Sequence, residues 1–257
     1  LRRVRSDISE TDSAQRFASL GVDVFLGPAR FTAPDALEVD GARVPFRRVV
    51  LASGARAAVP AVEGLAGLGY VTNESVFNLT ARPERLLVIG GGPIGCELAQ
   101  AFARVGSHVT ILHRGARILP RDESDAASVV QRSLERDGVV IVCGATLSRA
   151  ERNESGKVLH YTVEGAAQSV AGDEILVAAG RAPQVEGMGL EAAGVAFTAR
   201  GVTVDDSLRT TNSRVYAVGD VESKHQFTHA ADAHARLVVQ NALFFGRKRV
   251  SALVMPW

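Results

Sequence analysis

The residues with the clearest chemical meaning are three glycines, Gly90, Gly92 and Gly95, spaced as G-x-G-x-x-G. They follow an apolar run at 86–89 that predicts a buried strand, and they open a segment with helical apolar spacing. In such a turn the first glycine permits the bend, the second admits a pyrophosphate, and the third allows close packing of helix and strand. The positive end of the helix faces the phosphates. The pattern predicts a dinucleotide-binding turn, against the alternative of a glycine-rich turn without a ligand.

The end of the next strand bears on the choice between the two nicotinamide cofactors. It carries His113 and then Arg114, with Arg117 and Arg121 close behind. A carboxylate there would bond the ribose hydroxyls of NAD, whereas guanidinium groups pair with the 2′-phosphate of NADP. The sequence therefore favours NADP and leaves NAD open. The alternative is that these arginines form a solvated surface.

Three further strand ends carry small residues or an acid. The apolar runs 49–52 and 175–179 end in Ser53-Gly54 and Gly180-Arg181, where a ligand could approach the backbone closely. Asp220 follows the run 215–218 and a glycine, a suitable place for bonding sugar hydroxyls. An ordinary turn or capping aspartate is an equally good interpretation of Asp220 from spacing alone.

The elements that would position these residues change in kind near Pro83. Before it, a short helix is predicted at 11–20, capped by Asp12 or Ser13, with Phe17 and Leu20 facing inward. Apolar and turn patterns then predict strands at 22–26 and 49–52, with a hairpin between them over 37–46.

After Pro83 strands and helices alternate. Strands are predicted at 86–89, 109–112, 139–142 and 175–179, with helices at 94–105 and 123–137. This order is a βαβ arrangement, which requires a parallel sheet with a right-handed crossover. A third section has strands at 202–204 and 215–218 and a long helix at 229–245.

Bulk composition narrows the class of protein. The formal net charge of +1 argues against nucleic acid as the main partner, and no apolar run is long enough to cross a bilayer. The two cysteines, Cys96 and Cys143, fit a reducing cytoplasm and are expected to be small core residues. No metal site and no catalytic residue is predicted.

Together these motifs resemble the pyridine nucleotide–disulfide oxidoreductase family, over nearly the whole chain. The stretches 72–77 (TNESVF) and 89–100 (IGGGPIGCELAQ) look most like its mercuric reductase-like branch, and the family also includes dihydrolipoamide dehydrogenase. The resemblance implies an α/β, Rossmann-like three-layer FAD/NAD(P)-binding fold with a β-meander, in which the nicotinamide domain is inserted in the FAD domain. It implies an FAD-binding remainder at 1–70, a NAD(P)-binding domain at 71–190 and a second FAD-binding segment at 191–257.

The resemblance also implies cofactor-binding roles. For the nicotinamide nucleotide and its contact with the flavin, the candidates are Gly90, Gly92, Pro93, Ile94, Gly95, Glu97, His113, Arg114, Gly180 and Arg181. For FAD, the candidates are Ala29 near the adenine, Ala52, Ser53 and Gly54 at the passage between domains, Asp220 on the ribitol, and Phe227, Thr228, His229 and Ala230 at a helix start facing the flavin pyrimidine ring. Ser53 replaces the family's more usual threonine.

The implied activity is hydride transfer from NADPH to FAD and then to a disulfide or metal-ion acceptor, in a cytoplasmic protein that is a homodimer at full length. The chain is expected to be a truncated form without the first FAD turn, the redox cysteines and the C-terminal dimerisation domain, so we expect weak FAD binding. His225, His229 and His234 do not replace that domain's acid–base pair. Two alternatives stay open: a ferredoxin-reductase- or NADH-oxidase-like flavoprotein without a redox disulfide, and a non-catalytic dinucleotide-binding module.

Overall fold

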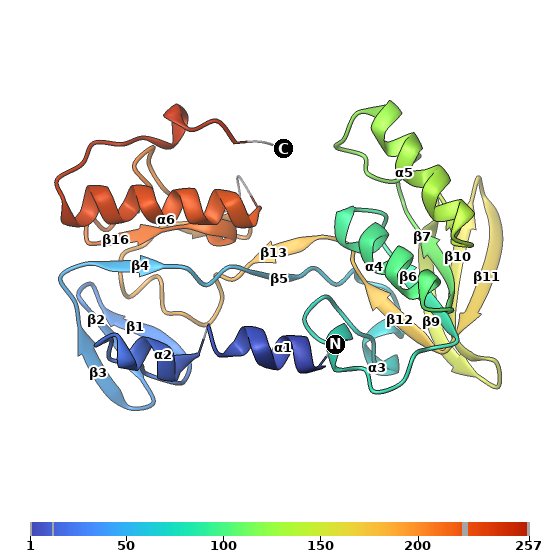
Figure 1. Cartoon of the computed structure of the whole chain (residues 1–257), viewed down its shortest axis with the longest axis horizontal. Helices are drawn as coiled ribbons and strands as arrows, with labels where there is room; N and C mark the ends of the chain where they lie inside the picture. The colour runs from blue at the N-terminus through green and yellow to red at the C-terminus, as the bar shows by residue number, and fades with distance from the viewer. Residues whose placement is uncertain (1, 12, 223–225, 256–257) are drawn as a thin grey trace. The chain divides into compact units, whose positions relative to one another are not determined.

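The computed structural model describes residues 2–11, 13–222 and 226–255 (Figure 1). The chain forms two compact units, one of Ala57–Arg181 and one of Leu1–Arg56 with Ala182–Trp257. The first of these units is therefore an insertion in the second along the chain. The boundaries predicted for the cofactor-binding domains, at 70/71 and 190/191, stay a prediction. The two compact units are defined by contacts within the chain, and such contacts do not show which cofactor a segment binds.

The inserted unit is built on a parallel sheet of four strands in the order β12-β6-β7-β8. The strands are β6 (Arg85–Ile89), β7 (His108–Leu112), β8 (Val140–Val142) and β12 (Glu174–Val177). Helix α4 (Pro93–Arg104) connects β6 to β7, and α5 (Ser124–Arg136) connects β7 to β8. The predicted βαβ order and parallel pairing are confirmed.

A β-meander supplies the third layer of this unit. It consists of β9 (Thr146–Asn153), β10 (Gly156–Val163) and β11 (Ala166–Gly172), all antiparallel. Two short helices complete the unit, α3 (Leu65–Leu68) and the 3-10 turn η1 (Val76–Asn78).

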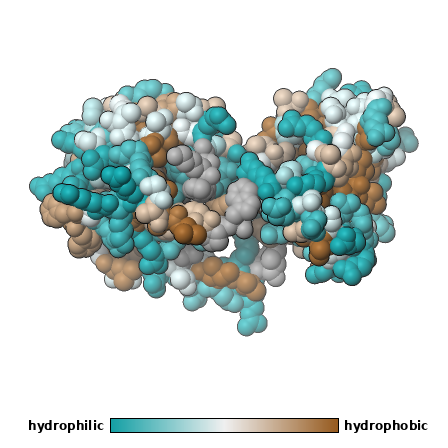
Figure 2. All heavy atoms as spheres, turned by 90° about the horizontal axis from the view of Figure 1, so that it is seen from above, coloured by the Kyte–Doolittle hydropathy of each residue, from teal (hydrophilic) through white to brown (hydrophobic). Residues whose placement is uncertain are grey.

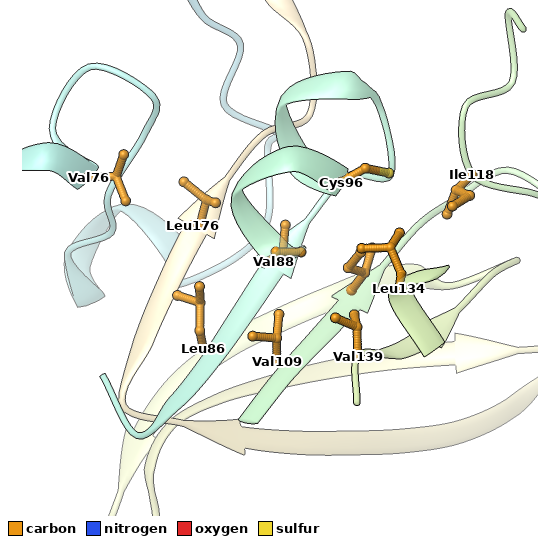
Figure 3. Packing of buried hydrophobic residues seen from close by; sticks show 11 residues of the cluster. Val76, Leu86, Val88, Cys96, Val109, Ile118, Leu134, Val139 and Leu176 are labelled. Carbon is orange, nitrogen blue, oxygen red and sulfur yellow. The ribbon is translucent and has the colours of Figure 1, made fainter. Parts of the chain in front are cut away.

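Strand β6 shows how the sequence makes these layers. Leu86 and Val88 point to the side of α4, where they pack with Val109, Cys96 and Leu176 (Figure 3). The alternate residues Leu87 and Ile89 belong to the cluster on the meander side. These four side chains, from Leu86 to Ile89, are at most 4% exposed, so this part of β6 is apolar without alternation because both of its faces are covered.

The other unit contains a two-stranded parallel pair, β4 (Val49–Leu51) with β16 (Val215–Ala217). Helix α6 (Thr228–Leu243) packs against β16 through an apolar cluster that includes Tyr216 and Leu237. A second cluster joins the pair to the antiparallel sheet β1 (Ala29–Ala33), β2 (Ala36–Val39) and β3 (Ala42–Pro45). The predicted hairpin is confirmed, with Asp40 and Gly41 at φ 48° and 77° in its tight turn.

The remaining elements are short. They are α1 (Arg2–Ser9), α2 (Ala14–Ser19), β5 (Ala55–Ala57), β13 (Arg181–Pro183), β14 (Phe197–Thr198), β15 (Gly201–Val202), η2 (Gly219–Glu222) and η3 (Val250–Ala252). Strands β5 and β13 pair with each other where the chain passes between the units. The strand predicted at 202–204 is wrong in its bounds, since β15 covers Gly201–Val202 and residues 203–204 lie outside it.

The N-terminal predictions are partly wrong. Ser13 does cap α2 by accepting the Arg16 N–H, and the other cap candidate, Asp12, lies outside the described residues. Phe17 and Leu20 do not face inward, since they are 46% and 65% exposed. Residues 22–26 form no strand, because none of the strands in the described part of the chain pairs with them and β propensity alone does not hold a strand.

The surface is mixed in character, with hydrophilic side chains over much of the face in Figure 2 and hydrophobic areas between them. Among the described residues no helix is long and apolar enough to cross a membrane. Cys96 is buried as predicted, in the apolar cluster that includes Leu86 and Val88. Cys143 is half-buried and packs against that cluster.

Candidate functional site

The glycine-rich turn lies between β6 and α4, and the three motif glycines differ in the space around the position of a Cβ atom. A Cβ on Gly90, whose φ is 115°, would lie 2.3 Å from the Ala178 oxygen. A Cβ on Gly95 would lie 2.1 Å from the Gly90 oxygen, so this residue allows α4 to approach the turn. A Cβ on Gly92 would meet nothing within 4 Å among the described residues. Gly92 therefore faces open space, where a ligand could reach its backbone.

The first turn of α4 is suited to an anion. Gly92 is the N-cap residue and supplies no side-chain cap, and Pro93 and Ile94 begin the helix. The helix has 12 residues, with the positive end of its dipole at this turn. Glu97 is exposed on α4, Gly95 is buried against the sheet as predicted, and Ala99 is buried as well.

His113 follows β7, but its ring is turned toward the glycine-rich turn. Its Nδ1 accepts the Gly91 N–H at 3.1 Å, and its Nε2 is buried with no hydrogen-bond partner among the described residues. Burial lowers the pKa of the imidazole, and the positive charge of Arg114 lowers it further. The neutral form of the ring is therefore favoured near pH 7, and its Nδ1 is engaged by the Gly91 N–H.

The three arginines after His113 differ in what they contact. Arg117 donates to the carbonyls of Leu119, Pro120 and Asp122 at 2.8, 3.2 and 2.7 Å, so its guanidinium holds the loop. Arg114 and Arg121 are exposed, and in the described part of the chain their guanidinium groups form no hydrogen bond or ion pair. The cationic groups available to a ligand are thus those of Arg114 and Arg121.

Residues 178–181 lie beside the turn at the end of β12. The Ala178 N–H donates to the Ile89 carbonyl at 2.8 Å, which brings this strand end against the turn. Gly180 has φ 128° and its carbonyl accepts the Ala58 N–H at 2.9 Å. Arg181, the next residue, is half-buried. The structure therefore brings Gly180 to the same edge of the sheet as the glycine-rich turn.

The other predicted residues lie in the second unit. Ala52 and Ser53 follow β4 and are exposed, and the Ser53 hydroxyl donates to the Gln184 carbonyl at 3.0 Å. The Gln184 N–H donates to the Gly54 carbonyl at 2.9 Å, and Arg56 forms an ion pair with Glu186 at 2.9 Å. These contacts hold the two chain segments of this unit together next to its boundary.

Asp220 lies in η2 directly after β16, and Thr228 begins α6. Phe227 is the helix N-cap residue, and its ring stacks on His229 with centroids 5.3 Å apart. Ala230 is buried, and Ala29 starts β1 with its side chain exposed. The structure thus places the FAD candidates at two strand ends, one helix start and the first residue of β1.

His234 is the second histidine of α6, and His225 lies outside the described residues. His234 is fully buried, with its Nδ1 3.9 Å from an oxygen of the equally buried Glu222. This pair ties α6 to η2. Among the described residues there is no group of three histidines, cysteines or acids that could hold a metal ion.

Two contacts at this site were not predicted from the sequence, the one between His113 and Gly91 and the one from Arg117 to its own loop. Gly91 has a conformation open to other residues, yet its Cβ would lie 2.8 Å from the Ile118 side chain and 3.0 Å from His113 Cγ. A third glycine between two functional ones therefore marks a packed position.

The chain is similar to known proteins over most of its length. A family model described as "Pyridine nucleotide-disulphide oxidoreductase" matches residues 7–235. The chain is 34% identical to a mercuric reductase of Bacillus cereus over 237 residues, covering 92% of this chain and 38% of that protein. It is also 34% identical to a dihydrolipoyl dehydrogenase of Thermus scotoductus, covering 86% and 49% of the two chains.

The fold agrees with that of a solved relative. The HOCl-induced flavoprotein disulfide reductase RclA from Escherichia coli superposes with a TM-score of 0.87 and 30% sequence identity, over 97% of this chain and 58% of that chain. The chain therefore spans about two fifths to three fifths of the length of these relatives. The match of the family model over most of the sequence shows that the chain belongs to the pyridine nucleotide–disulphide oxidoreductase family.

Proposed function

We propose that this chain binds a nicotinamide nucleotide at the β6–α4 turn and forms part of an FAD site, within an FAD-dependent oxidoreductase of the disulfide or mercuric reductase type. The observation that carries the proposal is the open space at Gly92, beside the uncapped N-terminus of α4. Gly90 and Gly95 are needed for backbone packing, whereas Gly92 is needed only if something approaches it. Family membership implies FAD and a nicotinamide nucleotide as cofactors.

In this proposal the pyrophosphate lies over Gly92 and the first turn of α4, held by backbone N–H groups and the helix dipole. The 2′-phosphate of NADP is paired by Arg114 and Arg121, since Arg117 is occupied by its own loop. Gly180 gives the nucleotide a close backbone approach at the neighbouring strand end. When bound, FAD supplies the chemistry, taking a hydride from NADPH and passing two electrons to the acceptor.

In the second unit, Asp220 would bond the ribitol hydroxyls of FAD and the start of α6 would face the flavin ring. The start of a 16-residue helix stabilises negative charge on a reduced flavin. Ala29 and the segment 52–54 would complete the contacts to FAD. The buried His234–Glu222 contact fixes α6 on η2, so Asp220 and the helix start keep a defined spacing.

For the whole protein we propose a cytoplasmic homodimer that reduces a small molecule or an ion. The two cysteines, one of them buried, fit a reducing compartment. The names of its relatives point to mercuric ion or a disulfide as the class of acceptor. Size measurement of the full-length protein by light scattering tests the dimer.

The nucleotide site is tested by titrating the chain with NADPH and with NADH in a calorimeter at low salt. We expect both to bind, with NADPH binding more tightly. Arg114→Ala should weaken NADPH binding about tenfold, the loss of roughly 1.4 kcal/mol that a charge-assisted hydrogen bond supplies, and should leave NADH binding nearly as before. Arg200→Ala, at an exposed arginine of the other unit, is the control and should change neither.

Equal affinity for both nucleotides in the wild-type chain would refute the NADP assignment, and absence of binding by either would refute the nucleotide site itself. Retention of stoichiometric FAD by the purified chain would contradict the expectation of weak FAD binding. Nucleotide binding without NADPH-dependent reduction of any acceptor by the full-length protein would favour the non-catalytic module.

A further inference from the structure

The contact between His113 and Gly91 links the end of β7 to the glycine-rich turn that follows the neighbouring strand, β6. Gly91 lies between the first two glycines of the motif, and its N–H donates to Nδ1 of the His113 ring at 3.1 Å. An imidazole nitrogen accepts a hydrogen bond only when it carries no proton. The geometry therefore assigns the neutral tautomer with its proton on Nε2.

Gly91 is also held from its other side. Its carbonyl accepts the Leu119 N–H at 2.7 Å and lies 3.6 Å from the Cys96 sulfur. A Cβ at this position would collide with the side chains of Ile118 and His113, at 2.8 and 3.0 Å. The middle residue of the turn is thus fixed by contacts on both of its polar groups, and its neighbour Gly92 inherits that orientation.

We propose that His113 is a positioning residue for the nicotinamide nucleotide: by accepting the Gly91 N–H it holds the glycine-rich turn in the shape that receives the pyrophosphate. This inference rests on the proposed nucleotide site and deepens it. His113 stands where a carboxylate would bond the ribose of NAD, but its ring points into the turn, and its effect on the ligand passes through Gly91 and Gly92. Arg114 and Arg121 then distinguish NADP from NAD by pairing with the 2′-phosphate.

Protonation breaks this contact, because the imidazolium presents an N–H donor at Nδ1 to another donor, the Gly91 N–H. In the described part of the chain, the polar and charged groups that act on the ring are that N–H of the turn, the Arg114 cation, and the Arg117 carbonyl of the following loop. Burial and Arg114 together lower the pKa of His113 below the ordinary value of 6.5, while the Arg117 carbonyl partly opposes them. The hydrogen bond from the Gly91 N–H to His113 is therefore fully formed above about pH 6.5. It is lost as pH falls through the lower pKa of the folded state.

The probe that isolates this effect is ADP-ribose, which has the pyrophosphate but lacks a 2′-phosphate that would itself titrate near pH 6. Its dissociation constant for the full chain is measured by calorimetry between pH 5 and pH 8. For the wild-type chain we expect binding to weaken as pH falls through the lowered pKa of His113. For His113→Leu we expect at least tenfold weaker binding at pH 8 and little dependence on pH, because no acceptor remains for Gly91.

His113→Asn is the second variant, since its Oδ1 lies as many bonds from the backbone as Nδ1 and accepts a hydrogen bond at every pH. It should bind ADP-ribose more tightly than His113→Leu and without the acid loss of the wild-type chain. His108→Asn, an exposed histidine at the start of β7, is the matched control and should keep the wild-type pH profile.

A readout without ligand separates this inference from the proposed function. Hydrogen exchange at the Gly91 amide of the free chain should be at least tenfold faster in His113→Leu than in His113→Asn, at equal melting temperature. Equal affinity of wild type and His113→Leu for ADP-ribose at pH 8, or equal exchange at Gly91, overturns the inference. A wild-type chain that protects Gly91 but binds neither ADP-ribose nor NADPH overturns the proposed function and leaves the contact as structural only.

Discussion

Alanine substitutions at Gly92 and Gly95 should separate binding from folding within one motif. The two glycines are three residues apart and share the start of α4, yet they have opposite surroundings. A Cβ on Gly92 meets nothing within 4 Å among the described residues, whereas a Cβ on Gly95 lies 2.1 Å from the Gly90 oxygen. Gly92→Ala therefore adds a methyl group to open space, and Gly95→Ala adds one to occupied space.

The expected magnitudes follow from these distances. For Gly95→Ala, helix and turn must separate by roughly 1 Å, and overpacking of this kind costs about 1–3 kcal/mol. Gly92 has φ −80°, which alanine adopts without strain. At this position the loss of a glycine N-cap and the lower entropy of the unfolded chain are each worth about 0.5–1 kcal/mol and oppose each other. The stability of Gly92→Ala should therefore stay within about 0.5 kcal/mol of wild type.

The assay pairs thermal unfolding by circular dichroism with NADPH titration. For a chain of 257 residues, 1 kcal/mol moves the melting temperature by about 2–4 °C. Gly95→Ala should melt roughly 2–12 °C lower, while Gly92→Ala should melt within about 2 °C of wild type and bind NADPH at least tenfold more weakly. Wild-type affinity in a well-folded Gly92→Ala chain would refute the argument that a pyrophosphate approaches this residue.

Two further predictions concern ionisable groups of the inserted unit. Asp173 accepts hydrogen bonds from the backbone N–H and the guanidinium of Arg85, at 2.7 and 2.6 Å, and these contacts hold its pKa below its usual range. Its contribution is therefore present above about pH 3.9 and lost as pH falls through its lower folded pKa, so Asp173→Asn should lower the melting temperature at pH 7 by a few degrees and less so near pH 3. Burial raises the pKa of the Cys96 thiol to about 11, so iodoacetamide at pH 8 should leave Cys96 unmodified in the folded chain and modify it after denaturation, as mass spectrometry would show.

The glycine turn and the layers around it could be predicted because the sequence pattern itself carries the steric constraints. Leu86 to Ile89 is apolar without alternation, which indicates a strand covered on both faces, and β6 has that environment. Residues 22–26 have a similar apolar composition but form no strand. The difference lies in partners, since a strand is stabilised by its neighbours and its own composition does not reveal whether a neighbour is present.

The candidate site was harder to predict at the level of side chains. The residue types of His113, Arg114 and Arg117 correctly indicate a basic strand end. Residue types do not show which of these side chains already form hydrogen bonds within the protein. Arg117 gives its guanidinium to three carbonyls of its own loop, and His113 gives its acceptor to Gly91. Both contacts depend on where the loop after β7 turns back, which is a property of the folded chain that no local pattern encodes.

The contacts within the inserted unit support a final prediction, that Ala57–Arg181 folds when expressed alone. Its two apolar clusters, one on each face of the parallel sheet, are made entirely of residues between 57 and 181. The ends of the fragment are adjacent, since the Ala58 N–H donates to the Gly180 carbonyl at 2.9 Å. Cutting at these positions therefore removes no part of either cluster and leaves no long loose segment.

The fragment should unfold cooperatively in urea and bind ADP-ribose within about threefold of the affinity of the full chain, because the turn, α4 and the loop after β7 all lie inside it. The same cut made at 71–190, the boundary expected from cofactor roles, removes Leu65 and Leu68 from the cluster on the meander side. That fragment should be less stable, by about 2–4 kcal/mol for the loss of a fully buried leucine such as Leu65. Equal urea midpoints for the two fragments would show that α3 contributes nothing to the fold, and the contact-based boundary at 56/57 would then have no energetic meaning.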